Sequence, residues 1–97
     1  MVSPHLFNPT ALQAGVPFHM IRDFYNYLYE HMQPGDAVLA ILSNDLFSTL
    51  QYADPITMRA LPRITTFIYM NFPAGSWGSR ETTLAWLNNK EAKDGIE

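Results

Sequence analysis

The sequence predicts an all-α fold, a compact bundle of four main helices, and three observations lead to this prediction. Apolar residues recur at steps of three and four along most of the chain. Prolines and glycines divide the chain into segments of helical length with short connections. Hydrophobic residues make up 47% of the 97 residues, which excludes a disordered chain and suffices for one domain. We expect a helical domain at 17–91 between an N-terminal arm at 1–16 and a frayed tail at 92–97.

The first segments predict an irregular arm followed by a well-defined helix. Residues 1–16 contain Pro4, Pro9 and Gly15, so we expect at most a short helical turn at 10–14. The first main helix is expected to begin at Pro17, because a proline at the first helical position has no N–H to leave unpaired. It should end at the Gln-Pro-Gly sequence at 33–35. Its apolar stripe has steps of three, four, three and four and consists of Phe18, Ile21, Tyr25, Leu28 and Met32.

The second segment predicts one continuous helix that begins after Asp36 as its N-cap. Four leucines lie on one face of this helix at steps of three, four and four: Leu39, Leu42, Leu46 and Leu50. The spacing keeps its phase through the polar residues 43–45, so we prefer helix over a strand at 37–42, although short apolar runs leave both open. In a continuous helix Asn44 and Asp45 would flank the leucine face.

The third segment begins with a strong helix start, because Asp54 is a good N-cap and Pro55 suits the first turn. Pro62 predicts that this helix is broken or kinked, since a proline inside a helix removes a hydrogen bond and costs about 3 kcal/mol. Residues 64–69 are rich in β-branched and aromatic side chains, so a strand remains the alternative there.

The last helix is expected to be capped by Ser79 and to run from Arg80 to about residue 90. Its expected inward-facing residues are Leu84 and Leu87, with Trp86 on the flank.

Composition excludes several classes of function. A net charge of −3 with only six lysines and arginines provides no basic stripe, so we expect no direct nucleic-acid binding. The absence of cysteine excludes disulfides, a thiol nucleophile and zinc–thiolate sites. The spacing of His5, His19 and His31 matches no metal-ligand pattern, and we expect no metal, no cofactor and no enzyme activity. No apolar run is long enough to span a membrane, so a cytoplasmic protein is expected.

Three groups of side chains are candidates for binding a protein partner. The tyrosines of the first helix surround much of its circumference, so either the N-terminal arm covers them or one face meets another chain. Polar side chains inside the second segment either contact a partner or are used locally, Asn44 as a cap and Asp45 beside an arginine. A tryptophan between glycines either plugs the core, which we prefer, or is an exposed anchor. The candidate residues are Tyr25, Tyr27, Tyr29, Asn44, Asp45 and Trp77.

Arginines are the candidates for binding a small anionic ligand. Arg59 and Arg63 are four residues apart, and together with Arg80 they would present planar guanidinium groups that suit phosphate. Surface ion pairing is the preferred alternative for all three, because Pro62 disturbs the helical spacing.

Three stretches carry a resemblance: AVLAILSNDLFSTLQYAD, LPRITTFIYMNFP and SWGSRETTLAWL. Together they resemble a loose group of small proteins encoded by bacteriophages, prophages and plasmids, over about residues 35–87. Pro55 and Pro62 depart from the pattern of that group. The matching positions are Asn44, Asp45, Leu46, Ala53, Asp54, Pro73, Trp77, Gly78, Ser79 and Trp86. The resemblance implies a mobile-element origin, in which small proteins without catalytic motifs often bind host factors.

These observations lead to one functional hypothesis and one alternative. We expect a small non-catalytic protein of phage or mobile-element type that binds a host protein, as an inhibitor of a bacterial defence system, and that also self-associates. The alternative is an oligomeric binder or sponge for a nucleotide signal, with phosphate held by the three arginines.

Overall fold

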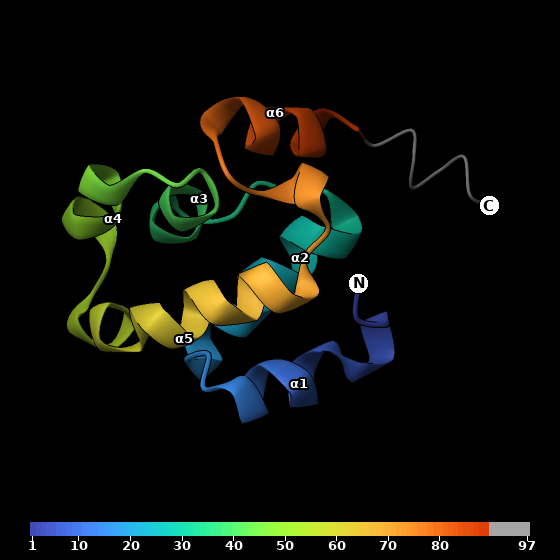
Figure 1. Ribbon diagram of the computed structural model, residues 1–97, viewed down its shortest axis with the longest axis horizontal. Helices are drawn as coiled ribbons and strands as arrows, with labels where there is room; N and C mark the ends of the chain where they lie inside the picture. The colour runs from blue at the N-terminus through green and yellow to red at the C-terminus, as the bar shows by residue number, and fades with distance from the viewer. Residues whose placement is uncertain (90–97) are drawn as a thin grey trace.

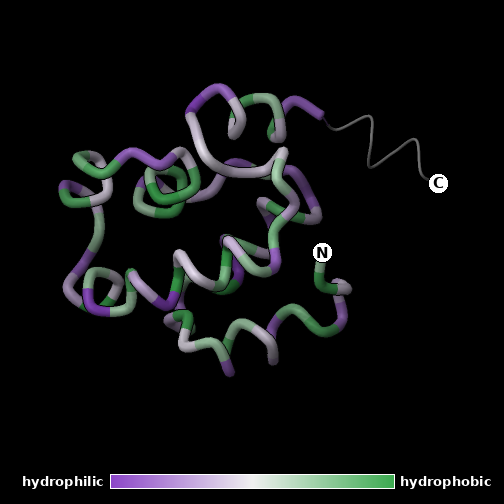
Figure 2. Tube along the Cα trace, in the orientation of Figure 1, coloured by the Kyte–Doolittle hydropathy of each residue, from purple (hydrophilic) through white to green (hydrophobic). Residues whose placement is uncertain are grey.

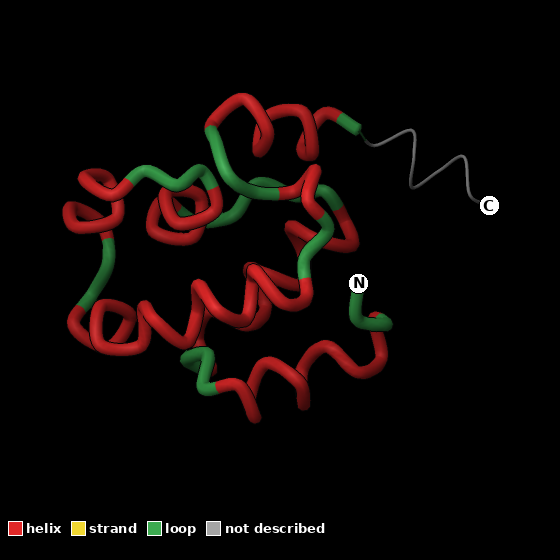
Figure 3. The backbone as a smooth tube through the Cα atoms, in the orientation of Figure 1, coloured by secondary structure: helices red, strands yellow, loops and turns green. Residues whose placement is uncertain are grey.

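The computed structural model describes residues 1–89, and every element in this range is helical (Figures 1 and 3). The expected tail at 92–97 and the end of the last expected helix lie outside the described residues. The 37–42 and 64–69 segments are helical, so the strand alternatives are excluded there. The elements are, in order, the 3₁₀ helix η1 (Pro4–Leu6), α1 (Phe7–Ala14), α2 (Phe18–Glu30), α3 (Asp36–Leu42), α4 (Leu46–Tyr52), α5 (Pro55–Asn71), the 3₁₀ helix η2 (Ala74–Ser76) and α6 (Arg80–Asn88).

The helices form one compact body with a radius of gyration of 12.7 Å. Helix α1 packs on α2 and α5, while α3 packs on α2, α4 and α6. In Figure 1, α1 and α5 lie in the lower half of the molecule and α6 lies at the top, above α3. The all-α prediction is confirmed, but the expected number of four main helices is wrong, because the described residues contain six α-helices.

The N-terminal arm is not irregular. Phe7, in α1, is completely buried, and its ring makes edge contacts with Tyr25, Tyr29 and Phe67 at centroid distances of 5.8, 5.7 and 5.5 Å. Pro9 does not interrupt α1, because it occupies the first turn, where backbone N–H groups have no partner within the helix. The first 16 residues therefore contribute to the core.

Helix α2 buries a stripe that shares only Ile21 and Leu28 with the expected one. The expected Phe18 is 80% exposed at its first turn, and Met32 lies beyond the helix, which ends at Glu30. Its buried residues are Met20, Ile21, Phe24, Tyr27 and Leu28.

The second expected helix is two helices. Helix α3 ends at Leu42 and α4 begins at Leu46, so the continuous helix is wrong. Figure 2 shows the link between them as a hydrophilic stretch between two apolar ones. Gly35, not Asp36, is the N-cap of α3, and the Gly35 N–H donates to the Asp23 carboxylate at 3.0 Å. The leucine face is divided as well, because Leu46 is 60% exposed.

Helix α5 runs through Pro62 as one 17-residue element, so the expected break does not occur. Its start is as predicted, since the Asp54 side chain caps it by accepting from the Thr57 N–H at 2.7 Å. Downstream of the proline, the hydroxyls of Thr65 and Thr66 donate to the carbonyls of Leu61 and Pro62.

Helix α6 is capped by Ser79, as predicted. Thr83 is its fully buried residue, and Leu84 is 49% exposed, so the inward placement of Leu84 is wrong. Leu87 and Trp86 pack partly buried against the core.

Candidate functional site

A cavity of about 400 Å³ lies between the end of α3, the outer face of α5 and the turn that precedes α6. Seven residues line it: Ile41, Asn44, Thr65, Thr66, Ile68, Tyr69 and Trp77. Two of them, Asn44 and Trp77, are residues for which the sequence suggested partner binding. We call this cavity the Asn44–Trp77 groove.

The end of α3 places Asn44 at the groove. Asn44 has a φ of +57°, and the Asn44 and Asp45 N–H groups donate to the carbonyls of Ile41 and Ala40. This pattern is a Schellman motif, which closes a helix with one left-handed residue. Asparagine tolerates that conformation better than most residues other than glycine. The polar stretch at 43–45 is therefore a helix boundary.

Asp45 has a capping role and does not line the groove. Its carboxylate accepts from the Ser48 N–H at 3.1 Å and from the Ser48 hydroxyl at 2.7 Å, at the start of α4. These hydrogen bonds, and the positive charge of Arg80, lower the pKa of Asp45. The residue is thus used locally, but as the cap of α4, a role that was not expected for it; the expected arginine acts on it only through the charge of Arg80.

Trp77 is held between the core and the groove. Its side chain packs partly buried against the core, and its ring meets Tyr69 edge-on at a centroid distance of 6.1 Å. The following Gly78 has a φ of +119°, and its N–H donates to the Leu42 carbonyl at 2.8 Å, which ties the turn to α3. The buried Nε1 of Trp77 has no hydrogen-bond partner in the described part of the chain.

The groove offers mainly apolar and aromatic contacts. No charged side chain lines it. The Thr65 and Thr66 hydroxyls already donate to backbone carbonyls, so they can act toward a ligand only as acceptors. Asn44 contributes an exposed amide, and Tyr69 is 70% exposed. Such a lining suits a neutral apolar or aromatic group and gives no counter-charge to a phosphate.

The three tyrosines of α2 are used within the chain. Tyr27 is completely buried, and its hydroxyl donates to the Ser76 carbonyl at 2.6 Å. Tyr25 and Tyr29 pack on Phe7, and the Tyr29 hydroxyl donates to the Val2 carbonyl. Burial raises the pKa of both Tyr27 and Tyr29. The N-terminal segment therefore packs on Tyr25 and Tyr29, whereas Tyr27 is bonded by residues of η2 and α6.

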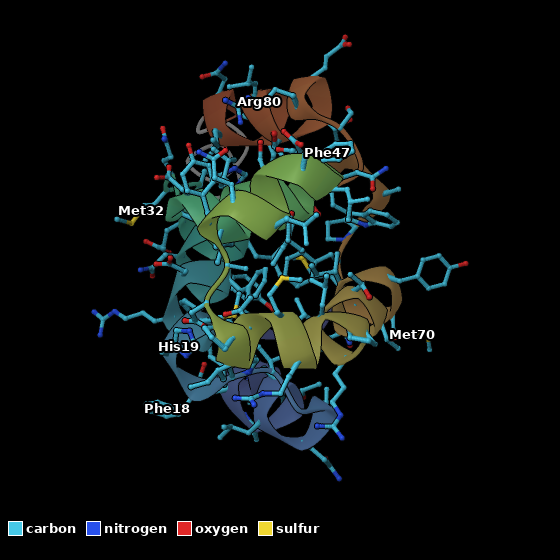
Figure 4. All side chains as sticks on the ribbon, turned by 90° about the vertical axis from the view of Figure 1, so that its left-hand side faces the viewer. Phe18, His19, Met32, Phe47, Met70 and Arg80 are labelled. Carbon is cyan, nitrogen blue, oxygen red and sulfur yellow. The ribbon has the colours of Figure 1, made fainter. Side chains whose placement is uncertain are left out.

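The three arginines do not form one cluster. Arg59 and Arg63 line a depression of about 370 Å³ with Gly15, between α5 and the α1–α2 turn. Arg80 lies on α6 at the top of the molecule, whereas α5 lies in the lower half in both views (Figures 1 and 4). The positive charge of Arg80 acts on Asp45 instead.

Tyr69 is one of the five groove residues that the sequence reasoning did not identify. A usable signal was present, because Ile64, Phe67 and Ile68 are spaced for one buried helix face. Tyr69 then falls outside that face. An exposed tyrosine opposite a buried stripe is a candidate contact residue.

Within residues 1–89, no group of three or more histidine, aspartate or glutamate side chains is arranged to hold a metal ion. No helix in that range has the length and apolar character needed to cross a membrane. Comparison with known proteins found no matching protein-family model, curated protein or solved structure.

Proposed function

We propose that the chain is a small non-catalytic binding protein that holds an apolar or aromatic side chain of a protein partner in the Asn44–Trp77 groove. The uncharged lining of the groove is the observation that carries this proposal. A pocket of several hundred cubic ångströms with apolar walls and few polar groups is typical of sites that accept an anchoring side chain. The Asn44 amide supplies a donor and an acceptor at the rim for a partner backbone.

The surface around the groove favours a protein partner over a small-molecule ligand. Tyr69, in the groove lining, and Met70, which follows it in α5, are 70% and 71% exposed, so large side chains are exposed on this part of α5. Exposed apolar side chains also occur elsewhere, and Figure 4 shows Phe18 and Met32 on one side of the molecule and Met70 on the other. Only 15% of the residues are charged, which is low for a surface that meets water alone.

The partner we propose is a host protein, and the setting is a phage or other mobile element in the cytoplasm of its host. The resemblance to small mobile-element proteins supports this setting, and two positions of that resemblance, Asn44 and Trp77, line the groove. Inhibition of a bacterial defence system is the form of this activity that we favour, because a stoichiometric inhibitor needs a binding surface and no catalytic group.

The test compares two exposed aromatic residues. Immobilised wild-type protein, Tyr69→Ala and Phe18→Ala are exposed to host lysate, and any captured protein is then purified and its affinity for each chain is measured. Phe18, 80% exposed on α2 and absent from the groove lining, is the matched control. We expect Tyr69→Ala to weaken binding by roughly 30-fold, as expected for an anchoring aromatic residue. Equal affinities for the two variants, or no specific capture by the wild type, would contradict the proposal.

A second candidate function is anion binding beside Arg59 and Arg63. Because α5 is unbroken through Pro62, the two arginines share one depression, which Ile56 also lines. No aromatic residue lines it, so a nucleotide would find no ring to stack on. Thermal-shift measurements with pyrophosphate and with cyclic dinucleotides test this candidate. A ligand at 100 times its Kd should stabilise the chain by about 2.7 kcal/mol, and Arg63→Ala should abolish the shift. No shift with any anion would exclude it.

A further inference from the structure

We propose that the turn at residues 43–45 is a hinge through which two copies of the chain exchange their C-terminal halves, with α3 and α4 joined into one helix. The partner in this inference is a second copy of the chain. The inference does not depend on the proposed host-protein function.

The sequence of this region is compatible with a single helix. Residues 36–52 contain neither glycine nor proline, so no residue in them forces a break. Leu39, Leu42, Leu46 and Leu50 keep helical spacing across the turn. The spacing fits one apolar face along a 17-residue helix. In the folded single chain only the first half of that face, at Leu39 and Leu42, is buried.

Helix α4 buries little apolar side-chain surface in the single chain. Thr49 is its one buried residue, whereas Leu46, Phe47 and Leu50 are 60%, 81% and 51% exposed. The turn itself depends on Asn44 in the left-handed region, at a φ of +57°, a conformation that costs energy for any residue except glycine. A continuous helix removes that cost and extends the leucine stripe, in exchange for the two hydrogen bonds that Ser48 donates to the Asp45 carboxylate.

The contacts between the two halves of the chain that lie away from the hinge can be exchanged without change. The Tyr27 hydroxyl bonds the Ser76 carbonyl, the Trp86 indole bonds the Tyr27 carbonyl, and the ring of Phe7 packs on Phe67. Each pair joins a residue before the turn to a residue after it. In an exchanged dimer the same pairs form between copies, so only the hinge differs from the single chain.

The exposed face of α4 is too small to explain association by simple docking. Even at about 150 Å² for each of its three large apolar side chains, it buries roughly half of the 800 Å² per partner that a stable interface needs. Exchange instead uses the whole interface between the halves. It also brings the two joined helices together at the hinge, where Leu46 and Leu50 of both copies can be covered.

The decisive comparison is between two substitutions of the same residue. Asn44→Ala disfavours the left-handed turn and favours helix, whereas Asn44→Gly does the reverse. We expect the dimer dissociation constant of Asn44→Ala to fall by about tenfold or more relative to wild type, and that of Asn44→Gly to rise by a similar factor. Sedimentation equilibrium over a range of concentrations measures both. The three chains should keep this order of dimer affinities after refolding at high protein concentration. If Asn44→Ala does not fold, the comparison of wild type with Asn44→Gly still tests the proposal.

A disulfide distinguishes exchange from docking. The Ser43 and Thr83 side-chain oxygens are 3.1 Å apart, and the natural chain has no cysteine. Ser43, the C-cap of α3, already has helical backbone angles, so it moves with the N-terminal half, whereas Thr83 lies in the C-terminal half. In the doubly substituted Ser43→Cys/Thr83→Cys chain carrying Asn44→Ala, oxidation of the isolated dimer should give a covalent dimer on a denaturing gel. A dimer that yields only internally linked single chains would overturn the exchange. So would equal dimer affinities for Asn44→Ala and Asn44→Gly.

Discussion

The indole Nε1 of Trp86 donates a 2.9 Å hydrogen bond to the backbone carbonyl of Tyr27. That carbonyl lies in the last turn of α2, where carbonyl groups lack partners within the helix. In return, the Trp86 carbonyl accepts from Nδ1 of His31 at 2.6 Å, and the two rings stack at 4.6 Å. Because a carbonyl can only accept, Nδ1 of His31 carries the hydrogen. Helix α6 thus closes the C-terminal end of α2.

We predict that Trp86→Phe lowers the free energy of unfolding by about 2 kcal/mol, because the partly buried Tyr27 carbonyl loses its donor. Trp77→Phe is the control, since the buried Nε1 of Trp77 has no partner among the described residues. Its cost should be below about 1 kcal/mol. Urea denaturation measures both values, and equal losses would contradict this account of the Trp86 hydrogen bond.

Tyr27→Phe should lower stability at neutral pH by about 1 to 3 kcal/mol, because the Ser76 carbonyl is left without its buried donor. The variant should also change how the free energy of unfolding depends on pH in alkaline solution. Burial raises the pKa of Tyr27 above its ordinary value of 10.0. The folded state therefore holds the proton more strongly than the unfolded state, and stability present below pH 10 is lost as the pH rises above it. Unfolding free energies between pH 8 and pH 11 should fall less steeply for the variant, and parallel slopes would refute this role.

Gly15→Ala should destabilise the chain by about 1 to 2 kcal/mol, since Gly15 ends α1 with a φ of +92°. An added Cβ would also lie 2.6 Å from Cδ of Arg63, so that side chain would have to move. Gly75→Ala is the control, because nothing lies within 4 Å of a Cβ at that position. Thermal melts of both variants make the comparison. A melting temperature for Gly15→Ala as high as that of Gly75→Ala would be the contrary result.

Pro62→Ala should raise stability by about 1 to 2 kcal/mol. The alanine N–H can bond the Met58 carbonyl, which a proline at position 62 leaves without its helical donor, and the gain exceeds the added freedom of the unfolded chain. Pro55→Ala is the contrasting variant, because Pro55 occupies the first turn of α5, where proline is favourable. Its stability should stay level or fall by up to about 1 kcal/mol. Chemical denaturation of both variants measures the difference, and no gain for Pro62→Ala would show that α5 has already relaxed around the proline.

Local signals in the sequence predicted the starts of α5 and α6. Asp54 and Ser79 were identified as caps because capping depends on residues within one turn. The α3–α4 boundary was missed because the leucine spacing suits a continuous helix, whereas Asn44 in the left-handed region ends α3 and the Asp45 carboxylate caps α4. Two residues of the groove lining, Asn44 and Trp77, were candidates from the sequence. Tyr69 becomes a candidate only once the buried face of α5 is identified.

The sequence alone determined that this chain is helical, where α5 and α6 begin, and that no cysteine chemistry is available to it, because these properties follow from composition and from neighbours within a few residues. The tertiary structure decided that Phe7 belongs to the core, that Tyr27 is unavailable to a partner, and that Asn44 and Trp77 line one groove. These outcomes depend on contacts between residues far apart in the chain, such as Phe7 with Phe67 and Gly78 with Leu42. Helical periodicity shows that a segment has an apolar face, but the partner of that face is selected only when all the helices compete for the same small core.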